Sequence, residues 1–377
     1  FGHIYEGFFS IVDLTDKANP VLISTLSSPT YFTHNIWPSD DGNYAFTTDE
    51  VSGGYLGAFD ISDPADPKMI DKIQSSPGED IVPHNAHVFG GYLVTSYYTD
   101  GVVVHDIANP SNMVEVANFD TSPLSSPTTS GCWGVYPYFG VGKFIASDRE
   151  EGLFVLSAVL HSGSYLHGNV IDQNTGFPLN DVNVEVLGPG INDQTNPLGD
   201  YQVGIEEIGT FEVVYSKVLY YPDTVEVSGF NHGDTVFQNV SLESIPQFTQ
   251  TFKVRDQDLQ PVEGAIVRAE HTYIQHEGIT DAAGEVTLDM YYVDNYQLYA
   301  GKWGYITDCD DSKFIDGGPI ITMQVDSAYY DDFTLDFGWS SSGSAEKGLW
   351  EREVPVGVVA GNGDVQNPEY DSQMDYC

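Results

Sequence analysis

The stretch GAFDISDPADPKMI, residues 57–70, contains a short apolar run ending at Asp60, a turn rich in Asp and Pro, and a second short apolar run. The same order recurs in SIVD (10–13) and VVHD (103–106), so Asp13, Asp60 and Asp106 are 47 and 46 residues apart. A repeat of this length, built from short strands and tight turns, is typical of β-propeller blades. We therefore predict that residues 1–160 form part of a propeller.

Related segments lie between these aspartates. His34-Asn35 leads to an apolar run at 44–49, and His84-Asn85 leads to one at 92–97. A third copy starts near Trp133 and leads to 143–148, and the final run at 152–157 has Ser157 where the aspartate is expected. Only about three blades are counted, whereas a closed ring usually has four to eight. We expect further blades N-terminal to this chain.

A longer repeat follows the propeller region. Pro178 and Pro261 are 83 residues apart, and Gly199 and Gly284 are 85 residues apart, within similar orders of short strands and turns. This pattern predicts two tandem β-sandwiches, at 164–245 and 247–327. Residues 328–377 read as the start of a further, jelly-roll-like β domain. The predicted fold class is thus all-β, with a partial propeller followed by two sandwiches.

Charge excludes several classes of partner. The chain has 13 basic and 56 acidic residues and a formal net charge of −43. Such a chain repels phosphate backbones and anionic lipid, so nucleic-acid binding is excluded as a prediction. No stretch approaches the roughly 20 apolar residues of a membrane span, so we predict no transmembrane segment.

The histidines form the sharpest candidate site. His34 and His84 hold equivalent places in neighbouring blades, and His87 follows closely. Imidazoles at one propeller face could bind a transition metal, with carboxylates from later strand ends. The interpretation that we favour is that each His-Asn pair hydrogen-bonds backbone groups of the turn between blades. The predicted metal ligands are His34, His84 and His87.

A candidate binding face is predicted on the same end of the blades. Its members are Trp37, Asp49, Asp100, Trp133 and Asp148. Asp148 with Glu150 also admits a glycosidase carboxylate pair, but we favour a solvated loop beside packed aromatic side chains. No nucleophile elbow, zinc-protease helix or phosphate-binding glycine loop occurs.

Acidic loops admit calcium without specifying a site. The segment DDGN (40–43) lacks the ligand spacing of an EF-hand, and we predict a hairpin tip with positive φ there. No cofactor is firmly predicted; Ca²⁺ or another divalent cation is the candidate.

Three segments closely resemble the choice-of-anchor B family of secreted bacterial proteins with LVIVD-type propeller repeats. They are HNIWPSDDGNYAFTTDE (34–50), PHNAHVFGGYLVTSYYTDGVVVHDIANP (83–110) and GCWGVYPYFGVGKFIASDREEGLFVL (131–156). Residues 166–243 and 248–325 are similar to carboxypeptidase regulatory-like β-sandwiches. The resemblance implies export and attachment to the cell surface.

These observations predict a non-catalytic extracellular or cell-surface protein. The propeller would present a binding or adhesion face for a polysaccharide or a surface protein, and the sandwiches would act as spacers. The alternative is an accessory region of a secreted hydrolase, a peptidase or glycosidase, whose catalytic part lies outside this chain.

Overall fold

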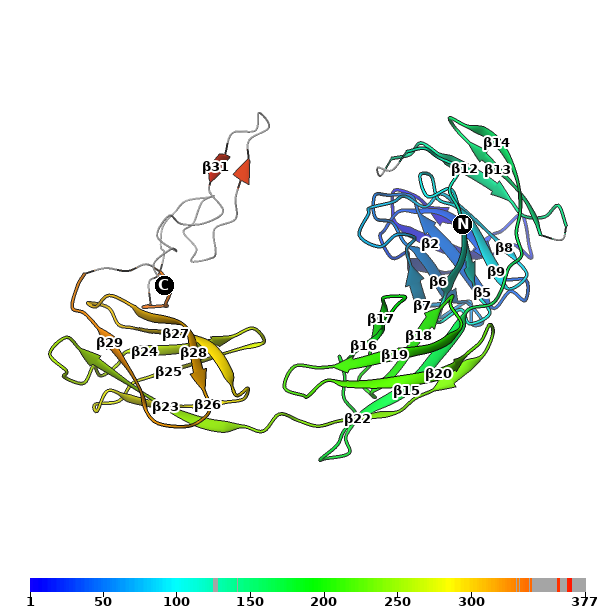
Figure 1. The fold of residues 1–377 in the computed structure, drawn as a ribbon. Coiled ribbons are helices and arrows are strands. Elements are labelled where there is room, and N and C mark those ends of the chain that lie inside the picture. Colours follow the sequence, from blue (N-terminus) through cyan, green and yellow to red (C-terminus); the bar gives the residue numbers. More distant parts are fainter. Residues whose placement is uncertain are drawn as a thin grey trace. The chain divides into compact units, whose positions relative to one another are not determined.

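The computed structural model describes residues 1–124, 128–140, 142–329, 331, 333–338 and 340, together with two short strands at 358–359 and 365–367. These residues form strands and turns and contain no helix, so the class is all-β (Figure 1). Among these described residues there is accordingly no helix that could span a membrane. The chain divides into two compact units. The first comprises 1–217 and 221–243, and the second comprises 218–220 and the residues from 244 on.

Residues 2–157 form four antiparallel sheets in which strands adjacent in sequence are hydrogen-bonded neighbours. The strands are β1 (Gly2–His3), β2 (Phe8–Asp13) and β3 (Val21–Ser27); β4 (Thr33–Pro38), β5 (Tyr44–Asp49), β6 (Leu56–Asp60) and β7 (Lys68–Ile73); β8 (Asn85–Phe89), β9 (Tyr92–Ser96), β10 (Val102–Asp106) and β11 (Val114–Phe119); β12 (Cys132–Tyr136), β13 (Lys143–Asp148) and β14 (Gly152–Ser157). Their assignment to about three propeller blades remains a prediction.

The three repeat aspartates occupy matching places in the first three sheets. Asp13, Asp60 and Asp106 end β2, β6 and β10, and each accepts a hydrogen bond of 2.8–2.9 Å from the backbone N–H two residues later. Each strand also has a register shift just before its aspartate. The shifts lie between Ile11 and Val12, Ala58 and Phe59, and Val104 and His105. The sequence repeat is therefore a repeat of turn and bulge geometry.

Packing between the sheets explains why the apolar run of β10 is continuous. Val103 belongs to the buried cluster that joins the second and third sheets, whereas Val102 and Val104 belong to the cluster that joins the third and fourth. Alternate side chains of a strand point to opposite faces. Both faces of β10 are covered by protein, so both sets of side chains are apolar.

Two further sheets follow in the first unit. One has the order β18 (Asp200–Ile205), β15 (Ser164–Asp172), β21 (Thr235–Phe237), and β22 (Val240–Leu242) also pairs with β15. The other has the order β17 (Ile191–Gln194), β16 (Asn183–Val186), β19 (Gly209–Ser216), β20 (Asp223–Phe230). A domain boundary at 160–164 within this unit remains a prediction.

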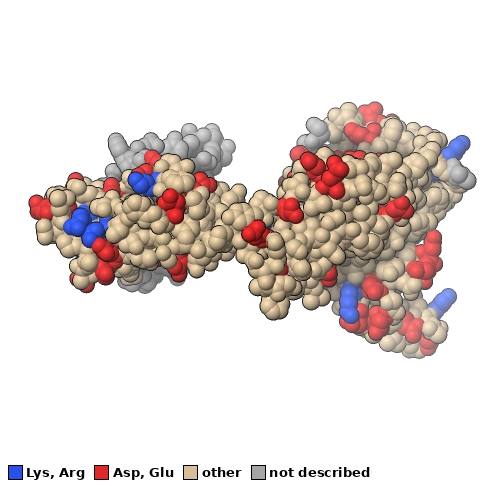
Figure 2. All heavy atoms as spheres, turned by 60° about the horizontal axis from the view of Figure 1, so that its bottom comes forward, with Lys and Arg blue, Asp and Glu red and all other residues tan. Residues whose placement is uncertain are grey.

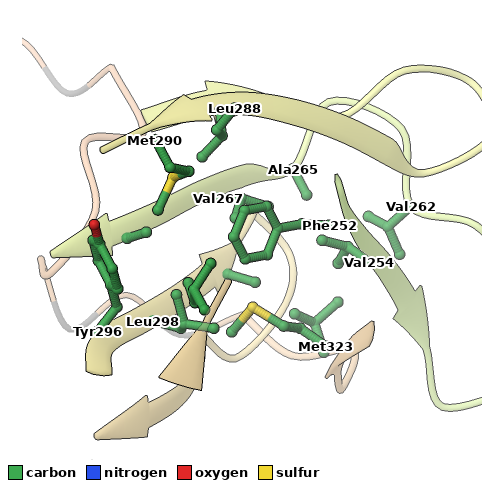
Figure 3. Close-up of a cluster of buried hydrophobic side chains, with 14 residues drawn as sticks. Phe252, Val254, Val262, Ala265, Val267, Leu288, Met290, Tyr296, Leu298 and Met323 are labelled. Atoms are coloured by element: carbon green, nitrogen blue, oxygen red, sulfur yellow. The ribbon is translucent and has the colours of Figure 1, made fainter. Parts of the chain in front are cut away.

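The second unit repeats this plan. One sheet has the order β26 (Glu285–Met290), β23 (Phe248–Asp256), β29 (Ile321–Val325), and the other β25 (Ile274–Ile279), β24 (Ile266–His271), β27 (Asp294–Gly301), β28 (Asp308–Ile315). Apolar side chains from both sheets fill the space between them, with Phe252 near the centre (Figure 3). The short strands β30 (Val358–Val359) and β31 (Val365–Asn367) pair with each other. Most of the predicted further module at 328–377 lies outside the described residues.

Matching backbone constraints relate the two predicted sandwiches. Gly199 and Gly284 have φ of +78° and +72°, and a Cβ at either would lie 2.5 or 2.6 Å from the carbonyl oxygen of Val170 or Val254. Only glycine tolerates such a position. The 85-residue spacing seen in the sequence thus corresponds to one turn geometry used twice.

The surface is strongly acidic. Asp and Glu side chains are scattered over the face shown in Figure 2, with few Lys or Arg among them. This distribution is that of a solvated acidic surface.

Candidate functional site

Three ring side chains occupy the same place in three consecutive sheets: His34 in β4, His84 immediately before β8, and Trp133 in β12. The residue that follows each of them pairs with a residue of the neighbouring strand that carries a hydroxyl group. These pairs are Asn35 with Thr48, Asn85 with Ser96, and Gly134 with Ser147. The register shifts across His34 and across Trp133, so both are bulge residues whose side chains are redirected.

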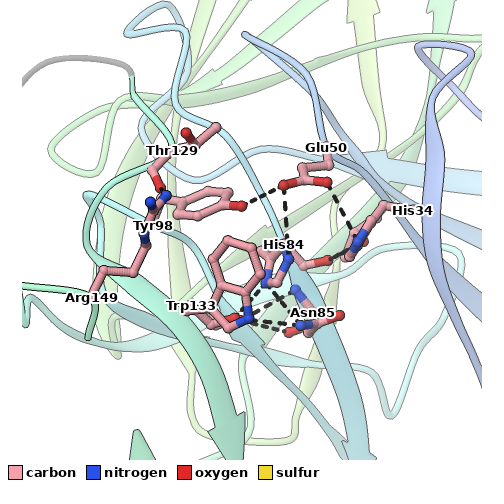
Figure 4. Close-up of polar contacts among 10 residues, drawn as sticks. His34, Glu50, His84, Asn85, Tyr98, Thr129, Trp133 and Arg149 are labelled. Atoms are coloured by element: carbon pink, nitrogen blue, oxygen red, sulfur yellow. Dashed lines mark hydrogen bonds and ion pairs between the residues drawn. The ribbon is translucent and has the colours of Figure 1, made fainter. Parts of the chain in front are cut away.

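The rings of these residues form a stack, named here the ring stack (Figure 4). The centroids of His34 and His84 are 4.5 Å apart with planes inclined by 26°. The centroids of His84 and Trp133 are 4.4 Å apart with planes inclined by 47°. His84 is buried, His34 is half-buried, and Trp133 is 47 % exposed. The stack is therefore buried at its centre, His84, and exposed at its Trp133 end.

Each histidine donates from Nδ1 to the carbonyl oxygen of the equivalent residue in the next sheet. The Nδ1 atom of His34 lies 3.2 Å from the oxygen of His84, and Nδ1 of His84 bonds the oxygen of Trp133. Because a carbonyl oxygen only accepts, the ring proton is on Nδ1, and in the neutral form Nε2 carries a lone pair. These bonds are the ones that the backbone interpretation of the His-Asn pairs predicts.

Neighbouring side chains bind the same two carbonyl groups. The Thr48 hydroxyl donates to the His84 oxygen at 2.5 Å, and the Ser96 hydroxyl donates to the Trp133 oxygen at 3.1 Å. The amide nitrogen of Asn85 lies 3.4 Å from that oxygen. The imidazoles are thus held in fixed orientations by backbone and side chain together.

A carboxylate faces the free edge of both imidazoles. Oε2 of Glu50 lies 3.4 Å from Nε2 of His34, and Oε1 lies 3.8 Å from Nε2 of His84. The Tyr98 hydroxyl donates to Oε1 of Glu50 (Figure 4). Within the described chain, His34, Glu50 and His84 are the group whose donor atoms could hold a metal ion, all within 4.8 Å of one another.

Burial shifts the pKa of two side chains in this cluster, His84 and Tyr98. It lowers the pKa of His84, which favours the neutral imidazole. Burial and the neighbouring Glu50 carboxylate raise the pKa of Tyr98, so its hydroxyl keeps the proton that it donates. The cluster therefore presents the Nε2 edges of two imidazoles to a carboxylate that is oriented by a phenol.

The third predicted metal ligand, His87, lies apart from this group. Its ring packs against Trp37, with centroids 4.6 Å apart, and against Tyr138 at 5.9 Å. Burial lowers its pKa, and its Nδ1 atom has no hydrogen-bond partner. His87 and Trp37 belong to an aromatic cluster, while Glu50 takes the third place beside His34 and His84.

The predicted aspartates brace loops within the fold. Asp49 is buried and accepts bonds from the backbone and hydroxyl of Thr30. Asp148 is buried and accepts bonds from the Thr121 hydroxyl and from two backbone N–H groups of the following turn. Asp100 accepts a bond of 2.6 Å from the Ser75 hydroxyl. The carboxylates of Asp49 and Asp148 are used by the structure itself.

Exposed aromatic side chains gather on β12 and the turn after it. They are named here the aromatic face and comprise Tyr136 (48 % exposed), Tyr138 (39 %) and Phe139 (62 %). The ring centroid of Tyr136 lies 5.2 Å from that of Tyr138 and 5.3 Å from that of Phe139. The Tyr138 hydroxyl donates to the backbone oxygen of Val88 at 2.8 Å, which ties the group to β8.

Comparison with protein families identifies two segments of this region. Residues 34–74 and 84–121 match the LVIVD repeat. The chain carries LVIVD repeats. The matched repeats begin at His34 and at His84, so the two stacked histidines are the first residues of both. A comparison with curated proteins finds no match.

Comparison with solved structures finds pilins and one other bacterial protein at low similarity. A streptococcal ancillary pilin is 10 % identical, with 75 % of this chain and 81 % of the pilin covered and a TM-score of 0.31. The minor pilin GBS52 of Streptococcus agalactiae is 10 % identical, with 45 % and 98 % covered and a TM-score of 0.30. The TIE protein of Bacillus anthracis is 14 % identical, with 67 % and 59 % covered and a TM-score of 0.22. No function is transferred from these proteins.

Sequence reasoning missed Glu50 and its equivalents. The hydroxyl-bearing partners of the three pairs above are Thr48, Ser96 and Ser147. Two residues after each of them stand Glu50, Tyr98 and Arg149, respectively. The guanidinium of Arg149 lies 5.3 Å from the Trp133 ring centroid, so it contacts the stack as Glu50 and Tyr98 do. Alignment of TTDE, TSYY and ASDR in the three copies is the signal that could have revealed this second row.

Proposed function

We propose that this chain is a non-catalytic binding region of an exported or cell-surface protein, with the aromatic face as its recognition site. The observation that carries the proposal is the exposure of three large rings in contact through Tyr136, 39–62 % each, within residues 136–139. Clustered exposed aromatic side chains mark binding surfaces in soluble proteins, because their desolvation is favourable when a partner covers them.

Rigidity supports this role. Tyr138 is tied to β8 through its hydroxyl, and its ring packs against the rings of His87 and Phe89. A face fixed before binding loses little conformational entropy when it engages a ligand. The sheets behind it thus act as a scaffold for recognition.

The net charge of the chain limits the classes of ligand that the aromatic face can bind. A net charge of −43 opposes polyanions, including nucleic acids and sulfated or phosphorylated polymers. Flat rings with phenolic hydroxyls suit the apolar faces and hydroxyls of a neutral polysaccharide, and also suit an apolar patch on a surface protein. These are the two ligand classes of the proposal.

Location and domain roles rest on the LVIVD repeats. Their resemblance to secreted choice-of-anchor B proteins supports export, and the two following sandwiches would act as spacers between the binding face and an attachment point. The predicted calcium or other divalent cation is not required for this role.

Binding of the full chain to arrays of neutral glycans and of bacterial surface proteins tests the proposal. We expect retention on one of the two arrays, with loss of at least about tenfold in affinity on Tyr136→Ala and on Phe139→Ala. Phe177→Ala is the matched control, because Phe177 is 71 % exposed but lies outside the aromatic face. Absence of binding on both arrays, equal loss in the control, or turnover of a bound ligand would contradict the proposal.

A further inference from the structure

We infer that His34, His84 and Glu50 form a binding site for a divalent transition-metal ion, independent of recognition by the aromatic face. Two imidazole nitrogens and one carboxylate are a ligand set typical of zinc. Their donor atoms already lie within 4.8 Å of one another. His34 and Glu50 come from one repeat and adjoin through the pairing of β4 with β5, and the packing of the second and third sheets brings His84 to them.

The hydrogen bonds leave the correct atoms free. Both Nδ1 atoms donate to backbone carbonyls, so the Nε2 atoms of both rings are free of hydrogen bonds to the backbone and face the Glu50 carboxylate. Acceptors that face each other repel unless a proton or a cation lies between them. The contact of 3.8 Å between Nε2 of His84 and Glu50 is too long for a hydrogen bond. A metal ion among the two Nε2 atoms and the carboxylate would bind all three groups at once, which a single proton cannot do.

Outer contacts match those of metal-binding histidines. Such histidines commonly donate their other N–H to a backbone carbonyl or a carboxylate, and ligating carboxylates are themselves hydrogen-bonded. Here the His34 and His84 rings donate to carbonyl oxygens, and the Tyr98 hydroxyl donates to Glu50. This outer set would keep all three ligands oriented toward one point.

Ligand chemistry selects the ion. Imidazole nitrogen favours Zn²⁺, Ni²⁺ or Cu²⁺ over the hard cations Ca²⁺ and Mg²⁺, which prefer oxygen ligands. Since zinc–nitrogen bonds are about 2.0–2.1 Å, the Nε2 edges of the stacked rings need to approach each other slightly on binding. Three protein ligands leave a fourth position for water or another ligand.

Isothermal titration of the full metal-free chain with ZnCl₂, in buffer with excess Mg²⁺, tests the site. The Mg²⁺ occupies weak carboxylate sites on the acidic surface. We expect one zinc ion per chain, with affinity reduced at least about 100-fold in Glu50→Gln and in His34→Gln, and about tenfold or more in Tyr98→Phe. His87→Gln is the matched control, because His87 is a half-buried histidine outside the group. The zinc affinity of this variant should equal that of the wild type.

Two further measurements keep the result clear of folding defects. Thermal unfolding of each metal-free variant shows whether it is folded, and Zn²⁺ should raise the Tm of the wild type and of His87→Gln but not of Glu50→Gln. Substitution with Co²⁺ should give visible absorption bands of low-symmetry nitrogen and oxygen coordination. Zinc binding that persists in a folded His34→Gln/Glu50→Gln double variant, or no binding by the wild type, would overturn the inference.

Discussion

The hydroxyl of Tyr165 donates a hydrogen bond of 2.9 Å to the carboxylate of Asp106, 59 residues earlier in the chain. The same oxygen accepts a bond of 2.8 Å from the backbone N–H of Gly163. Asp106 is the third of the repeat aspartates, and Tyr165 is the second residue of β15. Whereas Asp13 and Asp60 stabilise only their own turns, Asp106 also anchors the start of the next sheet.

Loss of this anchor should destabilise the protein. We expect Asp106→Asn and Tyr165→Phe each to lower the free energy of unfolding by about 1–3 kcal/mol, because buried donors or acceptors lose their partners. The double variant should lose less than the sum of the two. Urea unfolding measures the effect, with Asp60→Asn as the control at an equivalent turn. An equal loss in Asp60→Asn would show that the anchor contributes nothing beyond the turn.

Gly101 should tolerate no side chain, whereas Gly42 should. Both have positive φ, +75° and +73°. A Cβ on Gly101 would lie 2.2 Å from the carbonyl oxygen of Phe119, while one on Gly42 meets no atom within 4 Å. Alanine costs about 1–2 kcal/mol at either site through the left-handed conformation. Thermal unfolding should show a clearly larger loss for Gly101→Ala, and similar losses would refute the steric argument.

His105 should be a stability defect built into the third repeat. It is fully buried, neither ring nitrogen has a hydrogen-bond partner, and the equivalent residue in the second sheet is Phe59. An unpaired buried polar group costs about 1–3 kcal/mol, so we expect His105→Leu to stabilise the protein at pH 7. Urea unfolding gives the comparison, and destabilisation would show that the ring is needed for packing.

Acid should enlarge this difference. Burial lowers the pKa of His105 to about 3, so below its ordinary value of 6.5 the unfolded chain binds a proton that the native chain does not. The wild type therefore loses stability as pH falls from 6.5 toward 3, by about 2 kcal/mol at pH 5, and His105→Leu lacks this loss. His161→Leu, at an exposed position, controls for removal of a histidine. A constant difference between pH 7 and pH 5 would contradict the prediction.

Glu115 should have the opposite pH dependence. Burial raises its pKa to about 7, and Asp100 and Glu206 contribute in the same direction. The native chain then holds a proton that the unfolded chain releases above pH 4.5, so this contribution to stability is lost as pH rises from 4.5 through 7. Relative to the wild type, the free energy of unfolding of Glu115→Gln should increase by up to about 3 kcal/mol between pH 4.5 and pH 8. Unfolding at both pH values measures this, with the exposed Glu79→Gln as the control that should show little change.

The equivalence of His34 and His84 could be predicted, because repeats of equal spacing put equal residues in equal places. The inclusion of His87 with them follows closeness in sequence, and the structure separates it. His84 and His87 are three residues apart, and in extended chain such residues point to opposite faces. The alternation of side chains along a strand therefore already predicts that His87 lies apart from His84.

Strand positions, turns and the all-β class follow from the sequence because they depend on local chemistry. Short apolar runs form strands, and aspartate, proline and glycine end them, whatever lies elsewhere in the chain. The meeting of Glu50 with His34 and His84, and the anchoring of Tyr165 by Asp106, depend instead on how whole sheets pack. These partners lie 16 to 59 residues apart, from Glu50 beside His34 to Tyr165 beside Asp106. No local preference specifies such distances; the burial of apolar side chains between the sheets does.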